Sequence, residues 1–166
     1  QKAKALGMRF DLTLGSGWSF GGAKTPITEA AGQLRVERVK VDAATKRVPL
    51  PSMIGAEDLL GVFLSRTGGN VIAEADLIQL TDIRDDNVWL SADMSGLEVF
   101  FFISGKSGMQ VKRPSFGAEG YVLNHLDKPS VDNYLRHTGD RLFQSFDKTT
   151  IPFSVFCDSL EVYNQD

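Results

Sequence analysis

The sequence lacks the features that mark several large classes of protein. It has one cysteine, Cys157, so no internal disulfide can form and no redox compartment can be inferred. Its longest uninterrupted apolar run, residues 99–103, is far shorter than the ~20 residues of a membrane-spanning helix. Residues 1–6 are polar and too short for the apolar core of a secretory signal. Positive charge is not in excess: 18 basic and 21 acidic residues give a net charge of −3, which argues against non-specific nucleic-acid binding.

The composition is that of a folded, strand-rich chain. A length of 166 residues suits one domain, and chains of this size bury roughly 68–70% of the surface that the unfolded chain exposes. Apolar residues make up 42% and charged residues 23%, values that exclude wholesale disorder. Sixteen glycines against six prolines, together with eleven phenylalanines, favour turns and strands over a helix bundle.

Both ends of the chain have the pattern of strand–loop–helix units. Residues 2–7 resemble a last helical turn with a C-terminal glycine, and residues 8–14 alternate as in a strand. Residues 129–137 return to helical spacing, with Asp127 or Lys128 at the start and a break expected at Gly139. Residues 151–157 form an apolar run, which predicts a strand buried on both faces of a parallel sheet.

The middle of the chain predicts an all-β segment over residues 34–90. Alternating residues 34–41 and 48–50 are typical of a hairpin. Further strand-like stretches follow at residues 59–65, 71–80, 88–90 and 97–103, separated by turns rich in Gly, Asp and Asn.

A tryptophan stands in a glycine-rich loop directly after the first expected strand. The loop fails the dinucleotide-binding spacing because Phe20 occupies the position of the third glycine, and no Gly-Lys-Ser/Thr sequence follows as in a phosphate-binding loop. Two interpretations stay open. The loop is a tight turn, or Trp18 is a platform on which a sugar ring stacks, since an indole face packs on pyranose C–H groups.

Two carboxylates end the last expected strand. Asp158 and Glu161 follow the apolar run at the point where βα folds place catalytic groups, and such a carboxylate can serve as a general acid or base. Alternatively, both cap a following helix. Ser159 lacks the flanking glycines of a nucleophile elbow, and Cys157 fits a buried, inert thiol better than a nucleophile.

The remaining polar residues carry weaker signals. His125 and His137 lack metal-ligand spacing and fit hydrogen-bonded loop or helix residues. Lys106, Lys112 and Arg113 form a small basic cluster in a glycine-rich loop, where such clusters are usually solvated.

Four segments together resemble the catalytic region of bacterial α-L-rhamnosidases of glycoside hydrolase family 106. They are residues 6–13 (LGMRFDLT), 15–22 (GSGWSFGG), 111–120 (VKRPSFGAEG) and 156–161 (FCDSLE), and they occur in the order found in that family. The β-rich stretch between the second and third segments matches the family's variable insert. Asn124 stands where the family pattern has an aspartate.

The resemblance implies an α/β fold, a partial (β/α) TIM-type barrel with an inserted β-sandwich-like segment. Residues 1–33 would begin the catalytic barrel, residues 34–90 would form the insertion, and residues 91–166 would continue the barrel. A complete barrel takes about 250 residues, so we expect the remaining part of the same barrel as a partner of this chain, which alone would be incomplete.

The resemblance also implies a function. The family is inverting and calcium-dependent and removes terminal α-L-rhamnose from plant polysaccharides and glycosides. Calcium is therefore a candidate cofactor, with unknown ligands. The resemblance also implies a periplasmic or extracellular location. Glu161 would be one of the catalytic carboxylates, as general acid, and Asp158 would orient it or bind sugar hydroxyls. The other substrate-binding candidates are Trp18, Arg113, Glu119, Asn124 and His125. The alternative is a non-catalytic carbohydrate-binding or structural module.

Overall fold

A computed structural model describes residues 2–66, 71–91, 94–146 and 152–162. The chain divides into two units. Unit 1 comprises Gln1–Gly32 and Lys106–Asp166, and unit 2 comprises Gln33–Gly105. The β-rich segment expected over residues 34–90 lies within unit 2.

The chain is mostly β-sheet, so the expected partial TIM-type barrel is wrong. Strands take up 35% of the chain and helices 17%, with one helix of 16 residues. A (β/α) barrel alternates parallel strands with helices around a closed sheet. Here β1 (Asp11–Thr13) pairs in parallel with β11 (Ser154–Phe156). The five other strand pairings whose register the structure gives are all antiparallel.

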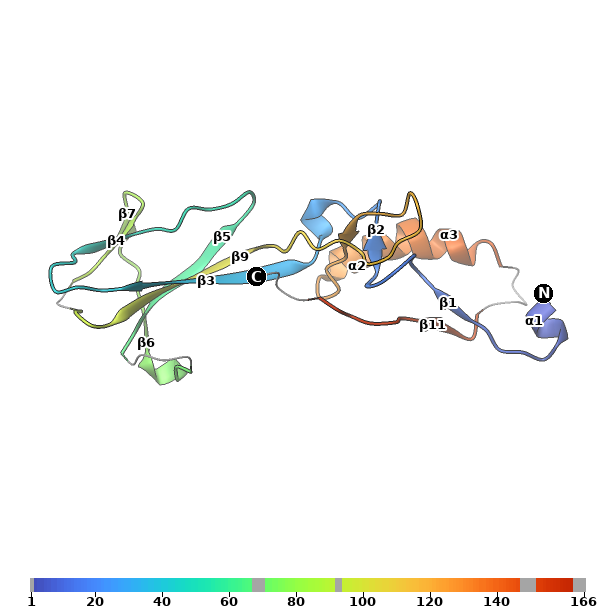
Figure 1. The fold of residues 1–166 in the computed structure, drawn as a ribbon, viewed down its shortest axis with the longest axis horizontal. Helices are drawn as coiled ribbons and strands as arrows, with labels where there is room; N and C mark the ends of the chain where they lie inside the picture. Colours follow the sequence, from blue (N-terminus) through green and yellow to red (C-terminus); the bar gives the residue numbers. More distant parts are fainter. Residues whose placement is uncertain (1, 67–70, 92–93, 147–151, 163–166) are drawn as a thin grey trace. The chain divides into compact units, whose positions relative to one another are not determined.

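Two sheets make up unit 2 (Figure 1). The larger has the strand order β3-β9-β5-β6 and the smaller the order β4-β8-β7. The bounds of these elements, with the 3₁₀ turn η2, are β3 Gly32–Lys40, β4 Arg47–Pro49, β5 Asp58–Ser65, η2 Glu74–Asp76, β6 Leu77–Gln79, β7 Ile83–Arg84, β8 Asn87–Trp89 and β9 Glu98–Lys106.

One hydrophobic core joins the two sheets of unit 2. Phe101 and Ile103 from β9 lie in it with Val48 from β4 and Val88 from β8, and all four are almost completely buried. The strands at residues 59–65 and 97–103 are therefore confirmed. The hairpin expected over residues 34–50 is wrong, because β3 and β4 belong to different sheets.

Unit 1 has short strands and the long helix. Its elements are α1 Lys2–Ala5, β1 Asp11–Thr13, β2 Gly21–Gly22, the 3₁₀ turn η1 Ile27–Glu29, β10 Tyr121–Val122, α2 Lys128–Tyr134, the π-helical turn η3 Leu135–Gly139, α3 Asp140–Phe143 and β11 Ser154–Phe156. The helical turn expected at the start of the chain is confirmed, and Gly7 after it has the positive φ of +66° that favours glycine.

The strand β11 is parallel, as expected, but it is not buried. All three of its residues are exposed, with 44% of Val155 and 53% of Phe156 accessible to solvent. β11 pairs with β1, and the sheet that these two form has no other strand among the described residues, which explains the exposure. The adjacent Cys157 is half-buried rather than buried, and Ile151 lies outside the described residues.

The long helix begins at the expected residue and lacks the break expected within it. The Asp127 carboxylate accepts a hydrogen bond of 3.0 Å from the Ser130 amide and so caps α2. The expected break at Gly139 is wrong: the helix continues through η3 and α3 to Phe143.

The helix also holds the glycine-rich loop in place. The Tyr134 hydroxyl donates a 2.8 Å hydrogen bond to the carbonyl of Leu14, the residue after β1. The Tyr134 ring packs with Leu14 and Leu123 in a small core of unit 1 and is 6% exposed. This buried contact fixes the start of the loop that carries Trp18.

Replacing Tyr134 by Phe removes that hydrogen bond and leaves the ring. We expect unit 1 to lose about 1–2 kcal/mol of its free energy of unfolding, because a buried carbonyl loses its partner. Native-state hydrogen exchange of unit 1 amides measures the loss. Tyr121→Phe is the matched control, since the Tyr121 hydroxyl makes no hydrogen bond to the described part of the chain. Equal exchange rates in the two variants would contradict the prediction.

Candidate functional site

Two backbone hydrogen bonds bring the glycine-rich loop to the loop before β10. The Trp18 amide donates to the Lys112 carbonyl at 3.1 Å, and the Lys112 amide donates to the Trp18 carbonyl at 2.6 Å. Gly17 has a φ of +85°, and a Cβ at this position would lie 2.2 Å from the Lys112 oxygen. Only glycine permits this close approach of the two loops.

A pair of serines forms a second connection between the same loops. The Ser16 hydroxyl donates to the Ser115 hydroxyl at 2.8 Å and accepts from the Ser115 amide, also at 2.8 Å. Together with the backbone bridge, this connection sets the positions of both Trp18 and Lys112.

Glu161 meets this bridge with its carboxylate. Lys112 forms an ion pair with Oε2 of Glu161, and the Ser159 hydroxyl donates to Oε1 at 3.1 Å. The nearby Trp18 indole is the smallest of the causes that lower the pKa of this carboxylate. The guanidinium of Arg113 lies 5.7 Å from the centroid of the half-buried Trp18 ring. We call Trp18, Lys112, Arg113, Ser159 and Glu161 the Trp–Glu cluster.

The cluster keeps Glu161 ionised. The hydrogen bond from Lys112 is the largest cause that lowers the pKa of Glu161, and the Ser159 hydrogen bond acts in the same direction. The Glu161 side chain is 43% exposed, so solvent screens the ion pair. A general acid has its pKa raised toward the working pH. In the arrangement seen here, Glu161 is instead a hydrogen-bond acceptor beside an aromatic ring.

Three of the residues predicted from the sequence come together in this cluster, namely Trp18, Arg113 and Glu161. Asp158 is exposed, and no contact between its side chain and Glu161 is described. Residues 157–162 contain no helix, so neither acid caps one within the described residues.

The other predicted residues lie outside the cluster. Glu119 is exposed, and the Asn124 side chain accepts a 3.1 Å hydrogen bond from the Leu126 amide. The His125 ring lies 6.2 Å from the Phe20 ring, and burial lowers its pKa. Both His125 ring nitrogens are buried and have no hydrogen-bond partner in the described structure.

Two functional candidates were missed in the sequence. The sequence indicates a solvated basic side chain for Lys112. For Ser159 it shows only that the flanking glycines of a nucleophile elbow are absent. The only local signal for Lys112 is its place within the VKRP stretch. Its pairing with Trp18 is a contact between distant loops and has no signature in either loop alone.

The described residues assign no ligands to the candidate calcium ion. They contain no group of three or more His, Cys, Asp or Glu side chains that could hold a metal ion. The described helices also include none that is long and apolar enough to cross a membrane.

Comparison with protein-family models, with curated proteins and with solved structures gave no match to this chain. The geometry of the Trp–Glu cluster is therefore the main support for any function.

Replacing Lys112 by Met tests the origin of the Glu161 charge state. We expect the pKa of Glu161 to rise toward that of a free glutamate, because the largest cause of its lowering is removed. Carboxyl carbon chemical shifts, followed by NMR over a pH series, measure this change. Lys128→Met is the control, since it removes an equally charged side chain that pairs with Asp132.

The same variant changes the acid stability. A lowered pKa in the folded state stabilises the protein above the pH at which free glutamate titrates, and this stabilisation disappears as the pH falls through the lowered pKa. Lys112→Met should lack that contribution above the titration range and differ little from the parent protein below it. An unchanged Glu161 titration would show that Lys112 does not set the pKa.

Proposed function

We propose that this chain is a segment of a glycoside hydrolase that cleaves terminal α-L-rhamnosides, with the Trp–Glu cluster as part of its sugar site. One observation carries the proposal. The segments that resemble the rhamnosidase family, 15–22, 111–120 and 156–161, are far apart in the sequence and meet in this single cluster. The fourth segment, 6–13, contains β1, which pairs with β11 just before residues 157–161.

The chemistry of the cluster suits a sugar. The Trp18 face provides an apolar surface for pyranose C–H groups. Glu161 accepts hydrogen bonds from hydroxyls, and Lys112 and Arg113 donate to ring substituents or to the glycosidic oxygen. An aromatic face with charged groups at its edge holds a sugar ring in one orientation.

Hydrolysis with inversion uses two carboxyl groups about 6.5–9.5 Å apart. In the proposed mechanism Glu161 protonates the departing glycosidic oxygen, and a second carboxylate from another segment takes a proton from the attacking water. Before Glu161 can donate a proton, its contact with Lys112 has to give way to the substrate oxygen, and the carboxylate has to take up a proton from solvent. Loss of that contact raises the pKa of Glu161, because it removes the largest stabilisation of the ionised form.

A non-catalytic carbohydrate-binding module is the second candidate. The ionised, half-exposed Glu161 beside Trp18 favours it, because this arrangement binds hydroxyls without a proton to donate. The two candidates share the sugar-binding cluster and differ only in whether Glu161 transfers a proton.

Glu161→Gln separates the two candidates. If Glu161 is the general acid, hydrolysis of an alkyl α-L-rhamnoside should fall about 10²–10⁴-fold, the range typical of general acid catalysis. Hydrolysis of a dinitrophenyl rhamnoside should fall far less, because that leaving group departs without protonation. The assay measures kcat on both substrates.

Glu74→Gln serves as the control, since it neutralises an exposed acid of unit 2. Retention of more than about a tenth of the activity on the alkyl rhamnoside would remove Glu161 from the acid role. Rhamnose binding without turnover in the intact protein that contains this segment would favour the binding module.

Trp18→Ala tests the stacking surface. We expect the Kd for L-rhamnose to rise about tenfold, because the apolar face that covers the sugar ring is lost. Trp18→Phe keeps a ring and should retain most of the affinity, although it removes the indole N–H. Isothermal titration calorimetry measures all three proteins. An unchanged affinity in Trp18→Ala would show that the sugar does not stack on this ring.

A further inference from the structure

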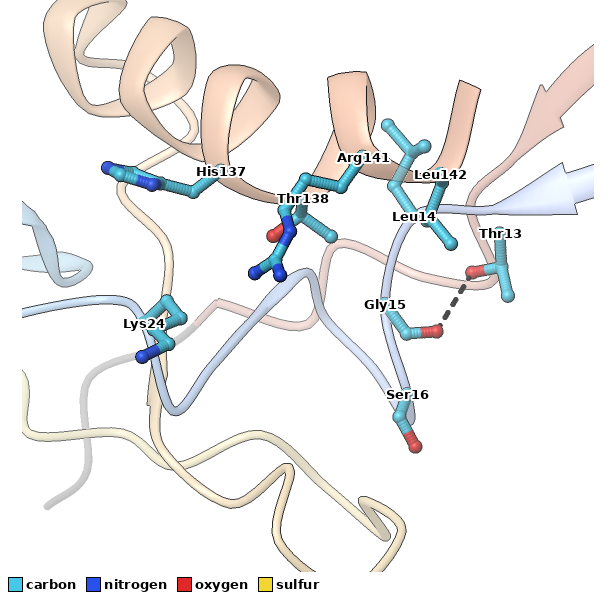
Figure 2. Close-up of a pocket in the computed structure, with 9 residues that line it drawn as sticks. All are labelled: Thr13, Leu14, Gly15, Ser16, Lys24, His137, Thr138, Arg141 and Leu142. Carbon is cyan, nitrogen blue, oxygen red and sulfur yellow. Dashed lines mark hydrogen bonds between the residues drawn. The ribbon is translucent and has the colours of Figure 1, made fainter. Parts of the chain in front are cut away.

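A cavity in unit 1 lies between the glycine-rich loop and the long helix (Figure 2). It has a volume of about 430 Å³ and opens widely to solvent. Its lining comes from the end of β1, the following loop and the helical segments η3 and α3. The residues are Thr13, Leu14, Gly15, Ser16, Lys24, His137, Thr138, Arg141 and Leu142.

The charge of this cavity is opposite to that of the chain. The whole chain has a net charge of −3, yet the lining contains Lys24 and Arg141 and no Asp or Glu. Within the described residues no ion pair engages either cation. In Figure 2 the Arg141 guanidinium extends from the helix toward the loop that carries Gly15 and Lys24. Two like charges around one hollow attract an anion and concentrate it there.

The neutral part of the lining suits a polyhydroxylated ligand better than a bare inorganic ion. Thr13, Ser16 and Thr138 contribute hydroxyl groups, while Leu14 and Leu142 contribute apolar surface. The volume falls in the range of pockets that hold small organic molecules. A sugar ring has both the hydroxyl and the C–H surfaces that such a lining matches.

A smaller cavity adjoins this one. A neighbouring cavity of about 260 Å³ shares Leu14, Gly15, Ser16, Lys24 and Thr138 with it. Because Lys24 borders both, a ligand longer than one sugar ring can keep its negative group near this lysine.

The frame of the cavity is held before any ligand binds. Tyr134 hydrogen-bonds to the Leu14 carbonyl, and the Ser16 hydroxyl is bound to Ser115. These contacts fix the loop backbone of the cavity, whereas the exposed side chains of Lys24 and Arg141 become ordered when the ligand binds.

We propose that this cavity binds the carboxylate-bearing ring of a sugar acid, with Arg141 and Lys24 as the carboxylate ligands. Arg141 offers the planar pair of N–H donors that matches a carboxylate, and Lys24 adds a second positive charge. The site is separate from the Trp–Glu cluster and does not depend on hydrolysis by Glu161.

The test is direct binding, by calorimetry, of two sugar acids, D-glucuronate and D-galacturonate, to the purified protein. D-glucose and sodium sulfate are the comparison ligands. We expect at least one sugar acid to bind at least about tenfold more tightly than glucose and than sulfate, because charged hydrogen bonds and ring contacts act together.

Variants that each remove one positive charge test whether the ligand binds in this cavity. Arg141→Gln should weaken binding of the sugar acid about tenfold or more, and Lys24→Gln should weaken it as well. Arg136→Gln is the matched control: it removes the same charge from the same helix, at an exposed residue that does not line the cavity. Its affinity should change less than about twofold. Glu74→Gln, at an exposed acid of unit 2, should bind the sugar acid as the parent protein does. Calorimetry measures binding without turnover, which separates this result from the proposed hydrolysis.

Several outcomes would overturn the proposal. They are binding of neither sugar acid, equal binding of glucose, sulfate binding as tight as that of the sugar acid, and unchanged affinity in Arg141→Gln. Sulfate binding alone would identify a site for small inorganic anions rather than one for sugars.

Discussion

The two hydrogen bonds between the main chains of Trp18 and Lys112 are the constraint on which the candidate site depends. They join the loop after β1 to the loop before β10, and Gly17 makes room for them because a side chain there would collide with the Lys112 carbonyl. Once the loops are joined, the Lys112 ammonium group pairs with Glu161, and the Trp18 side chain comes from the residue that the bridge joins to Lys112. Without these two hydrogen bonds, Trp18, Lys112 and Glu161, which come from three segments, would not be held close together.

The electrostatics of the Trp–Glu cluster differ from those of the cavity beside the long helix. In the Trp–Glu cluster the Glu161 carboxylate is already paired with Lys112 before any ligand arrives. In the cavity beside the helix, Lys24 and Arg141 have no carboxylate among the lining residues. A balanced pair suits a neutral sugar that exchanges hydrogen bonds with it, whereas unbalanced cations favour a ligand that brings its own negative charge.

The barrel expectation failed for a physical reason that concerns strand pairing. An apolar stretch shows that a segment is a strand, but its side chains do not say which neighbour it will pair with or in which direction. Residues 151–157 have the composition of a strand buried on both faces, yet β11 is exposed because it pairs only with β1 among the described strands. Likewise β3 and β4 alternate as the strands of a hairpin do, but β3 lies beside β9 in the larger sheet of unit 2 and β4 lies beside β8 in the smaller one.

What the sequence determined by itself is local. The Asp127 cap, the helical turn that ends at Gly7 and the strands of unit 2 depend on residues within a few positions of one another, so their signals can be read directly. Trp18 and Glu161 also stood out through their immediate neighbours. Only the tertiary structure decided that Lys112 pairs with Glu161, that His125 faces Phe20, and that Lys24 and Arg141 share a cavity. These contacts join residues far apart in the chain, and they exist only after main-chain hydrogen bonds and buried side chains have brought the segments together.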